Sequence, residues 1–207
     1  MIQDFALDQD SWLDENVQDI DARKGVCHAI SIDWVFAQLT QSRAWDVQTE
    51  YWRAVSHQRA YALTWQESLR GYWASKHYNT YLQIALPPTE KFVRDLARRK
   101  GREFHTYHLN YLYQLSSYIL ALPACAGLVI TIFGSSRDSP ADVQNWGHTV
   151  AMARDGRGMY RLLDINEGQY SWSLATPAST VGRDVERNLY VNYGSTGIRN
   201  IYIFRVG

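Results

Sequence analysis

Residues 147–164 read GHTVAMARDGRGMYRLLD. Two apolar segments flank the polar run 154–158, and this run contains the Asp-Gly pair that favours a tight turn between strands. We therefore predict an antiparallel hairpin over these residues. The hairpin matters for function because it brings the histidine near its start close to the aspartate at its end.

A turn centred on Gly156 sets the register of this hairpin and places His148 directly opposite Asp164. The same register pairs apolar residues on that face, Val150 with Leu162 and Met152 with Tyr160. Directly opposed residues have Cβ atoms about 4.5–5.5 Å apart. At that distance a carboxylate can accept a hydrogen bond from an imidazole, which fixes the tautomer and stabilises the imidazolium. A slip of one residue would put the two side chains on opposite faces.

The rest of the second half also carries strand signals, whereas the first half is helical. Apolar and β-branched runs predict strands at 127–134, 147–153, 159–164, 169–172 and 199–206, with a polar loop at 135–140 and a short helix at 179–189. Helical periodicity predicts helices at 27–41, 45–63, 65–76, 89–99 and 106–122, with Thr89 as the N-cap of the fourth. Helices followed by an antiparallel sheet define the α+β class.

Composition narrows the classes of function. A chain of 207 residues fits a single domain, 1–207, with a substantial core. Its 21 basic and 21 acidic residues balance, so the charge does not favour a nucleic-acid or anionic-membrane partner. The basic run 91–102 suits the C-terminal end of a helix. No stretch reaches the ~20 apolar residues of an integral membrane segment, and the acidic N-terminus lacks a signal-peptide pattern.

The two cysteines have different settings. Cys125 lies in an apolar run, and we expect it to be a small buried side chain. Cys27 opens a helical stretch just after Gly25, and the N–H groups at a helix start carry partial positive charge. Such a position favours the thiolate, the reactive form of cysteine, and its N–H groups can also hold an oxyanion. Cys27, His148 and Asp164 are therefore candidates for thiol-based catalysis.

The other histidines give weaker signals. His28 points about 100° around the helix from the candidate cysteine, and His57 and His77 are isolated in the sequence. His105 and His108 could share a helix face, but no third ligand is evident near them. We therefore predict neither a metal site nor a cofactor.

The three candidate residues lie in segments that resemble the YopT/AvrPphB family of bacterial cysteine proteases. The similarity lies in Gly-Val-Cys at 25–27 leading into a helix with Trp34, in Gly-His-Thr-Val-Ala at 147–151, and in Leu-Asp-Ile-Asn-Glu-Gly at 163–168. The long interval from cysteine to histidine and the short interval from histidine to aspartate also fit. Matching positions extend over roughly residues 25–168.

The resemblance implies a papain-like fold, with the nucleophile at a helix start and helices packed on an antiparallel sheet. It implies Cys27 as nucleophile, His148 as general base and then acid, and Asp164 as the residue that orients the imidazole. Family members are effectors delivered into host cells, where they cut particular proteins, including prenylated Rho-type GTPases and a kinase. The chain departs from the family at 19–24, which lacks the usual Gln or Asn of the oxyanion hole, and at Ile165, where proline is frequent.

Together, these features predict a cysteine endopeptidase that works through a thioester and acts on a host protein, with a GTPase or a kinase as candidate substrates. We expect secretion into the host cell without a cleavable signal peptide, or residence in the bacterial cytoplasm. The same triad would also serve a glutamine deamidase, an acyltransferase or an amidase, because all of these form a thioester. A further alternative is a non-catalytic binding module, in which aromatic helices within 45–76 bind a partner and Cys27 and His148 are packing residues.

Overall fold

The computed structural model describes residues 1–16, 26–40, 78–139 and 142–207. Within these residues, seven antiparallel strands form one sheet in the order β1-β6-β5-β4-β3-β7-β2. The strands are β1 (Ile2–Ala6), β2 (Phe104–Leu109), β3 (Ala126–Ser139), β4 (Asp142–Arg154), β5 (Tyr160–Asp164), β6 (Gly168–Ser171) and β7 (Ile198–Val206). The helices are α1 (Gln9–Asn16), α3 (Val26–Thr40), α5 (Tyr78–Arg99), α6 (Leu115–Leu120) and α7 (Ala178–Tyr193), with 3-10 turns η1 (Leu112–Gln114) and η2 (Gly194–Thr196).

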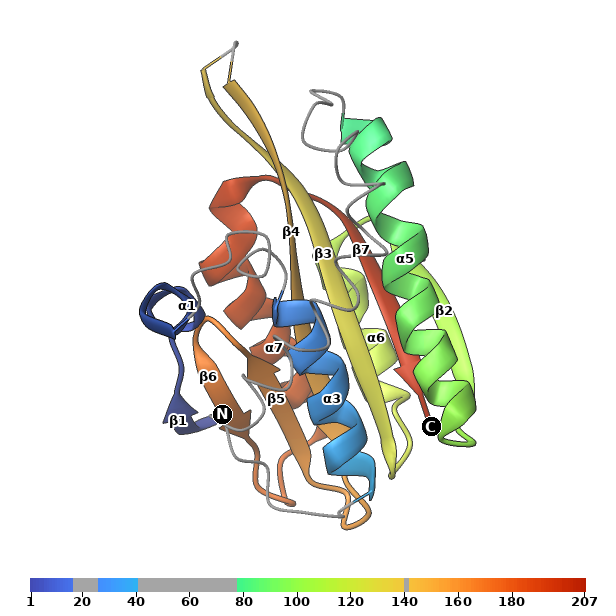
Figure 1. The fold of residues 1–207 in the computed structure, drawn as a ribbon. Coiled ribbons are helices and arrows are strands. Elements are labelled where there is room, and N and C mark those ends of the chain that lie inside the picture. The colour runs from blue at the N-terminus through green and yellow to red at the C-terminus, as the bar shows by residue number, and fades with distance from the viewer. Residues whose placement is uncertain (17–25, 41–77, 140–141) are drawn as a thin grey trace.

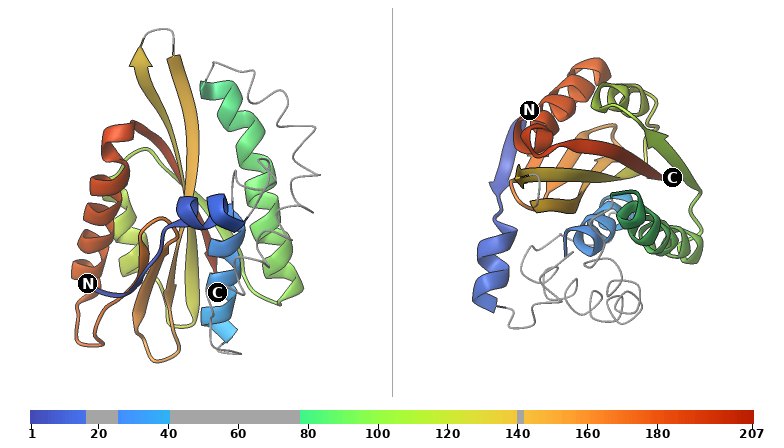
Figure 2. Two further views of the ribbon diagram at one scale, coloured as in Figure 1. Left: turned by 60° about the vertical axis from the view of Figure 1, so that its left-hand side comes forward. Right: turned by 90° about the horizontal axis from the view of Figure 1, so that it is seen from above.

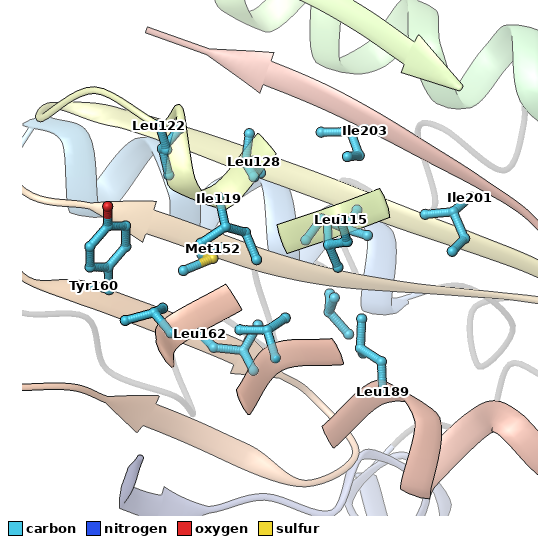
Figure 3. Close-up of a cluster of buried hydrophobic side chains, with 14 of the residues drawn as sticks. Leu115, Ile119, Leu122, Leu128, Met152, Tyr160, Leu162, Leu189, Ile201 and Ile203 are labelled. Carbon is cyan, nitrogen blue, oxygen red and sulfur yellow. The ribbon is translucent and has the colours of Figure 1, made fainter. Parts of the chain in front are cut away.

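Helices cover both faces of the sheet. Figures 1 and 2 show α3 and α5 on one face and α6 and α7 on the other. Each face has its own core because successive side chains of a strand point to opposite sides. On β4, Ala151 belongs to the core under α3, whereas Met152 belongs to the core under α6 and α7. Figure 3 shows this second core, where Leu115 and Ile119 of α6 approach Met152 and Leu162 of the sheet.

The helix that carries the candidate cysteine is buried on nearly all sides. From Cys27 to Phe36, all side chains except that of Asp33 are buried. A helix that is apolar all round belongs inside a protein. Its close approach to the sheet depends on Gly127 of β3, because a Cβ atom there would lie 2.5 Å from Cγ1 of Val35. The helix therefore packs closely against the sheet at Val35.

The predicted α+β class is confirmed, and so are most of the predicted elements. The helices predicted at 27–41 and 179–189 are present as α3 and α7, and the five predicted strands are present as β3 to β7. The basic run 91–102 lies at the C-terminal end of α5, as predicted. The helices predicted at 45–63 and 65–76 lie outside the described residues. No helix in the described part of the chain is long and apolar enough to cross a membrane.

The predicted N-cap at Thr89 is wrong. The helix α5 begins well before it and runs through Pro87 and Pro88 to its end at Arg99. A proline inside a helix costs about 3 kcal/mol, because it removes an N–H donor and clashes with the preceding turn. The helix continues nevertheless, because its apolar face packs into the core, where Thr89 and Val93 are buried. Packing against the sheet outweighs the local signal.

The helix predicted at 106–122 is wrong in its first half. Residues Phe104–Leu109 form β2 and pair along their whole length with β7, and helical structure begins only at η1. The edge strand β1 at the opposite end of the sheet is also absent from the sequence-based prediction. Both edge strands expose many of their side chains, so neither shows the clean apolar alternation that identifies a strand.

The loop predicted at 135–140 is largely strand. Strands β3 and β4 stay paired from Ala126↔Arg154 to Ser139↔Asp142 and project beyond the rest of the sheet as a two-stranded ribbon (Figure 1). Backbone pairing between two strands does not require apolar side chains, so a polar sequence can form this ribbon. The ribbon leads directly into the segment of β4 that carries the candidate histidine.

Candidate active site

The hairpin of β4 and β5 forms in a register two residues away from the predicted one. Met152 pairs with Leu162 and not with Tyr160, so His148 does not lie directly opposite Asp164. Because the side-chain period of a strand is two residues, a shift by two keeps every side chain on its predicted face. The histidine and the aspartate therefore still share one face of the sheet.

The register differs because the turn is centred one residue later than predicted. Its left-handed position is Gly158, with φ 88°, and not Gly156. Only glycine adopts such a φ readily, since it has no Cβ atom. The carboxylate of Asp155 closes the turn by accepting hydrogen bonds from the N–H groups of Arg157 and Met159, each at 2.9 Å. The Asp-Gly pair marks the turn, but the second glycine sets the register.

His148 and Asp164 meet diagonally at the end of the paired segment. Nε2 of His148 lies 2.9 Å from Oδ1 of Asp164, and both side chains are buried. Diagonal neighbours on adjacent strands are about 7–8 Å apart, a distance that long side chains can span. The contact predicted for a directly opposed pair therefore forms in the observed register as well.

Asp164 accepts hydrogen bonds from three residues although none of it is exposed to solvent. Besides the imidazole, the backbone N–H of Asn166 donates to its Oδ1 at 3.1 Å. The hydroxyl of Tyr193 donates to Oδ1 at 3.0 Å and to Oδ2 at 2.9 Å. Donors of this kind replace the water that a buried carboxylate loses. Tyr193 is not among the residues that the sequence analysis singles out.

Cys27 contacts the same imidazole. It is the second residue of α3, and its side chain lies close enough to that of His148 to raise the pKa of the imidazole. Because Nε2 of the imidazole is bonded to Asp164, Nδ1 is the nitrogen left for the sulfur. The start of α3 and the β4–β5 hairpin thus bring the three predicted residues into one chain of contacts, from thiol to imidazole to carboxylate. Gly25, the expected turn residue before the helix, lies outside the described residues.

The surroundings of His148 favour its charged form. Burial by itself lowers the pKa of His148, but the charge and hydrogen bond of Asp164, followed by the hydrogen bond and charge of Cys27, raise it to about 10. The imidazole is therefore protonated at neutral pH. The structure therefore places an imidazolium beside the side chain of Cys27.

His28, the neighbour of the candidate cysteine, holds α3 in place. Burial lowers the pKa of His28 to about 4, although its hydrogen bond to the carbonyl of Thr89 opposes this shift. The neutral ring donates from Nε2 to that carbonyl at 3.3 Å, so Nδ1 accepts from the hydroxyl of Thr149 at 3.3 Å. Ser31 donates to the carbonyl of Thr149 at 3.0 Å. These bonds tie the helix to the residue that follows the candidate histidine.

The remaining residues noted in the sequence lie elsewhere. Cys125 is exposed, at φ 59° in the turn before β3, so the prediction of a buried cysteine is wrong. His105 and His108 lie on strand β2 and not on a helix. In a strand, two residues three positions apart point to opposite faces. His57 and His77 lie outside the described residues. The described residues contain no group of three or more His, Cys, Asp and Glu side chains placed to hold a metal ion.

Comparisons with known proteins identify a similar fold. No protein-family model and no curated protein sequence matches this chain. Among solved structures, it is similar to the crystal structure of the Pseudomonas avirulence protein AvrPphB, with a TM-score of 0.54 and 18% sequence identity. The similarity covers 94% of this chain and 98% of that chain. At this level of identity the likeness shows that the two chains share a fold.

Proposed function

We propose that residues 1–207 form one papain-like cysteine endopeptidase domain, with Cys27 as nucleophile, His148 as general base and acid, and Asp164 as the residue that orients the imidazole. The observation that carries this proposal is the continuous contact from thiol to imidazole to carboxylate. A cysteine beside a histidine is common packing. A fully buried carboxylate that also fixes the same imidazole is the arrangement that a catalytic triad needs.

The first half of the proposed reaction forms a thioester. The thiolate of Cys27 attacks the carbonyl carbon of the scissile peptide bond, and the N–H groups at the start of α3 hold the resulting oxyanion. The imidazolium of His148 then gives its Nδ1 proton to the leaving amine, and the carbon–nitrogen bond breaks. Asp164 keeps the Nε2–H group in place, so Nδ1 stays directed at the reacting atoms.

The second half restores the resting enzyme. Neutral His148 takes a proton from water at Nδ1, and the hydroxide adds to the thioester carbonyl. The carbon–sulfur bond then breaks, which releases a carboxylic acid product and the Cys27 thiolate. The proton stays on the imidazole, so the thiolate–imidazolium pair is regenerated. A pKa of about 10 for His148 supports this cycle, because the acid needed in the first half is already protonated at neutral pH.

Two observations support a bacterial effector that acts on a host protein. The sequence resembles the YopT/AvrPphB family in three segments, and the fold is similar to that of AvrPphB over 94% of the chain. We propose a host GTPase or kinase as the substrate class. We further propose delivery into the host cell without a cleavable signal peptide, with residence in the bacterial cytoplasm as the alternative.

The proposed function can be tested by counting new protein N-termini in a host-cell lysate by mass spectrometry. The wild-type chain should produce a defined set of cleavages, and Cys27→Ala or His148→Ala should lower their rate by about 10⁴-fold or more. Asp164→Ala should have a smaller effect, because the thiol and its base remain. Cys125→Ala is the matched control and should cleave like the wild type, since this exposed cysteine lies outside the contact chain.

The same lysate experiment separates the alternatives. Release of ammonia or a gain in substrate mass, dependent on Cys27 but without new N-termini, would replace proteolysis by deamidation or acyl transfer. Binding of a partner that survives Cys27→Ala, with no thiol-dependent change in any protein, would contradict catalysis and favour a binding module.

A further inference from the structure

Tyr193, the last residue of α7, contacts both members of the His148–Asp164 pair. Its hydroxyl donates to the two carboxylate oxygens of Asp164, at 3.0 and 2.9 Å. Its ring stacks on the imidazole of His148, with the ring centroids 4.7 Å apart and the planes 29° from parallel. One side chain thus holds the carboxylate through its polar end and the imidazole through its face.

We propose that Tyr193 is a positioning residue of the thiol site, which fixes the carboxylate of Asp164 and the ring plane of His148 so that Nδ1 faces Cys27. This inference rests on the proposed function, because the imidazole needs a defined direction only if it serves a reactive thiol. It adds a fourth residue to the proposed site and gives α7 a part in the chemistry.

The hydroxyl completes the hydrogen bonding of a carboxyl group that water does not reach. Oδ1 of Asp164 accepts from His148 and Asn166 as well, whereas among the described residues Tyr193 is the donor to Oδ2. Without the hydroxyl, Oδ2 would have no hydrogen-bond donor from the described part of the chain, and the carboxyl group could turn away from the imidazole. Burial and the negative charge of Asp164 raise the pKa of Tyr193, so the hydroxyl stays protonated and remains a donor.

The ring restrains a motion that the carboxylate alone permits. An imidazole held at Nε2 can still tilt about that single hydrogen bond, which would move Nδ1 away from the thiol. An aromatic face stacked on the imidazole limits this tilt and also attracts the imidazolium, since a cation within about 6 Å of a ring centroid is stabilised. Trp146 lies beside Tyr193 with centroids 6.3 Å apart and supports the tyrosine ring.

The position of Tyr193 follows from the packing of α7. Val181, Val185 and Leu189 are buried and recur every four residues, so they form one stripe that faces the sheet. Tyr193 is the next position in this stripe and is carried to the site when the helix docks. Tyr190 lies off the stripe and is 68% exposed.

The test compares two substitutions at this position by the rate at which iodoacetamide alkylates Cys27. Tyr193→Phe keeps the ring and removes the hydroxyl, whereas Tyr193→Leu removes both. Tyr190→Phe is the matched control, because it removes a hydroxyl from the exposed side of the same helix. Mass spectrometry follows the alkylation between about pH 6 and about pH 10, on either side of an ordinary thiol pKa, with exposed Cys125 as internal reference.

The expected result is a loss of reactivity confined to low pH. Below an ordinary thiol pKa of about 8.5, fast alkylation requires a thiolate paired with the imidazolium. We expect the rate at about pH 6 to fall roughly fivefold in Tyr193→Phe, further in Tyr193→Leu, and not at all in Tyr190→Phe. At about pH 10 all four proteins should react alike, because the thiol ionises without help.

Three outcomes would overturn the inference. Rates at about pH 6 within about twofold of wild type in both Tyr193 variants would remove the positioning role and leave the proposed function intact. An equal fall in the alkylation rate of Cys27 at the low and the high pH, together with a lower melting temperature, would show that Tyr193 acts through packing alone. Equal alkylation of Cys27 in wild type and in His148→Ala would overturn the proposed thiol chemistry, and the inference with it.

Discussion

At the scale of single residues, two buried histidines close to the candidate cysteine take opposite charge states. Burial lowers the pKa of both rings, because a charged imidazole loses water. His148 contacts the carboxylate of Asp164, whose charge and hydrogen bond, together with those of Cys27, outweigh burial. His28 faces a hydroxyl and a carbonyl and stays neutral. Two neutral hydrogen-bonding groups stabilise a charged imidazole less than a carboxylate does. The groups that contact each imidazole therefore determine whether that imidazole is charged.

His28 should make the free energy of unfolding depend on pH on the acid side. Its pKa is about 4 in the folded chain against an ordinary 6.5, so the unfolded chain binds the proton more readily. The stabilisation is complete above pH 6.5 and is lost as the pH falls toward 4, by about 3 kcal/mol in total. Urea unfolding of wild type and His28→Gln at a series of pH values measures this loss.

The variant and its control separate His28 from other titrating groups. His28→Gln keeps a hydrogen-bonding amide but takes up no proton, so its stability should fall less steeply over this pH range. His105→Gln, whose parent histidine is 44% exposed in its side chain, should follow the wild type. Parallel curves for wild type and His28→Gln would contradict the prediction.

At the scale of elements, the site depends on how closely α3 approaches the sheet. Gly127→Ala would place a methyl group 2.5 Å from Cγ1 of Val35, which is too close for two carbon atoms. The helix must then move outward, and we expect a loss of about 1–3 kcal/mol in the free energy of unfolding. Alkylation of Cys27 at neutral pH should also slow, because the helix carries the thiol away from His148. Urea unfolding and alkylation kinetics measure the two effects.

A second substitution tests whether this clash is the cause. Val35→Ala removes Cγ1 and by itself costs stability, because it leaves a cavity. Combined with Gly127→Ala, it should restore part of the loss, so that the double variant is more stable than the sum of the single effects. Strictly additive losses would show that Gly127 matters for another reason.

At the scale of the whole molecule, the two histidines limit stability from opposite sides. The pKa of His148 rises from 6.5 to about 10 on folding, since burial, which lowers it, is outweighed by the charges and hydrogen bonds of Asp164 and Cys27 together. Its stabilisation is therefore complete below pH 6.5 and is lost as the pH rises through 10. Because the contribution of His28 is complete only above pH 6.5, we expect a maximum of stability near pH 6.5.

The predicted loss of stability above pH 6.5 can be tested with His148→Gln. Glutamine can still donate a hydrogen bond to Asp164 but does not titrate, so the free energy of unfolding should fall less between about pH 7 and about pH 10 than in the wild type. Urea unfolding followed by tryptophan fluorescence measures the difference. An equally steep fall in both proteins would mean that the deprotonation of His148 does not cause the loss of stability at high pH.

Features that depend on local pattern and residue chemistry could be predicted before the structure was known. Helical periodicity after Cys27 and β-branched runs such as 127–134 identified α3 and β3, because burying an apolar face requires that spacing in any fold. The same reasoning placed His148 and Asp164 on one face of a hairpin. That prediction held despite a wrong register, since an error of two residues preserves the face of every side chain.

Features that depend on contacts between distant segments became visible only in the folded chain. Pairing with β7 made β2 a strand, and packing on the sheet carried α5 through Pro87 and Pro88. The docking of α7 brought Tyr193 onto the imidazole of His148. Helical spacing puts Tyr193 on the buried stripe of α7, but it does not show which distant residue that stripe will meet. In each case the energy of contacts between distant segments outweighs the local preference, and no local pattern records which distant segment will be near.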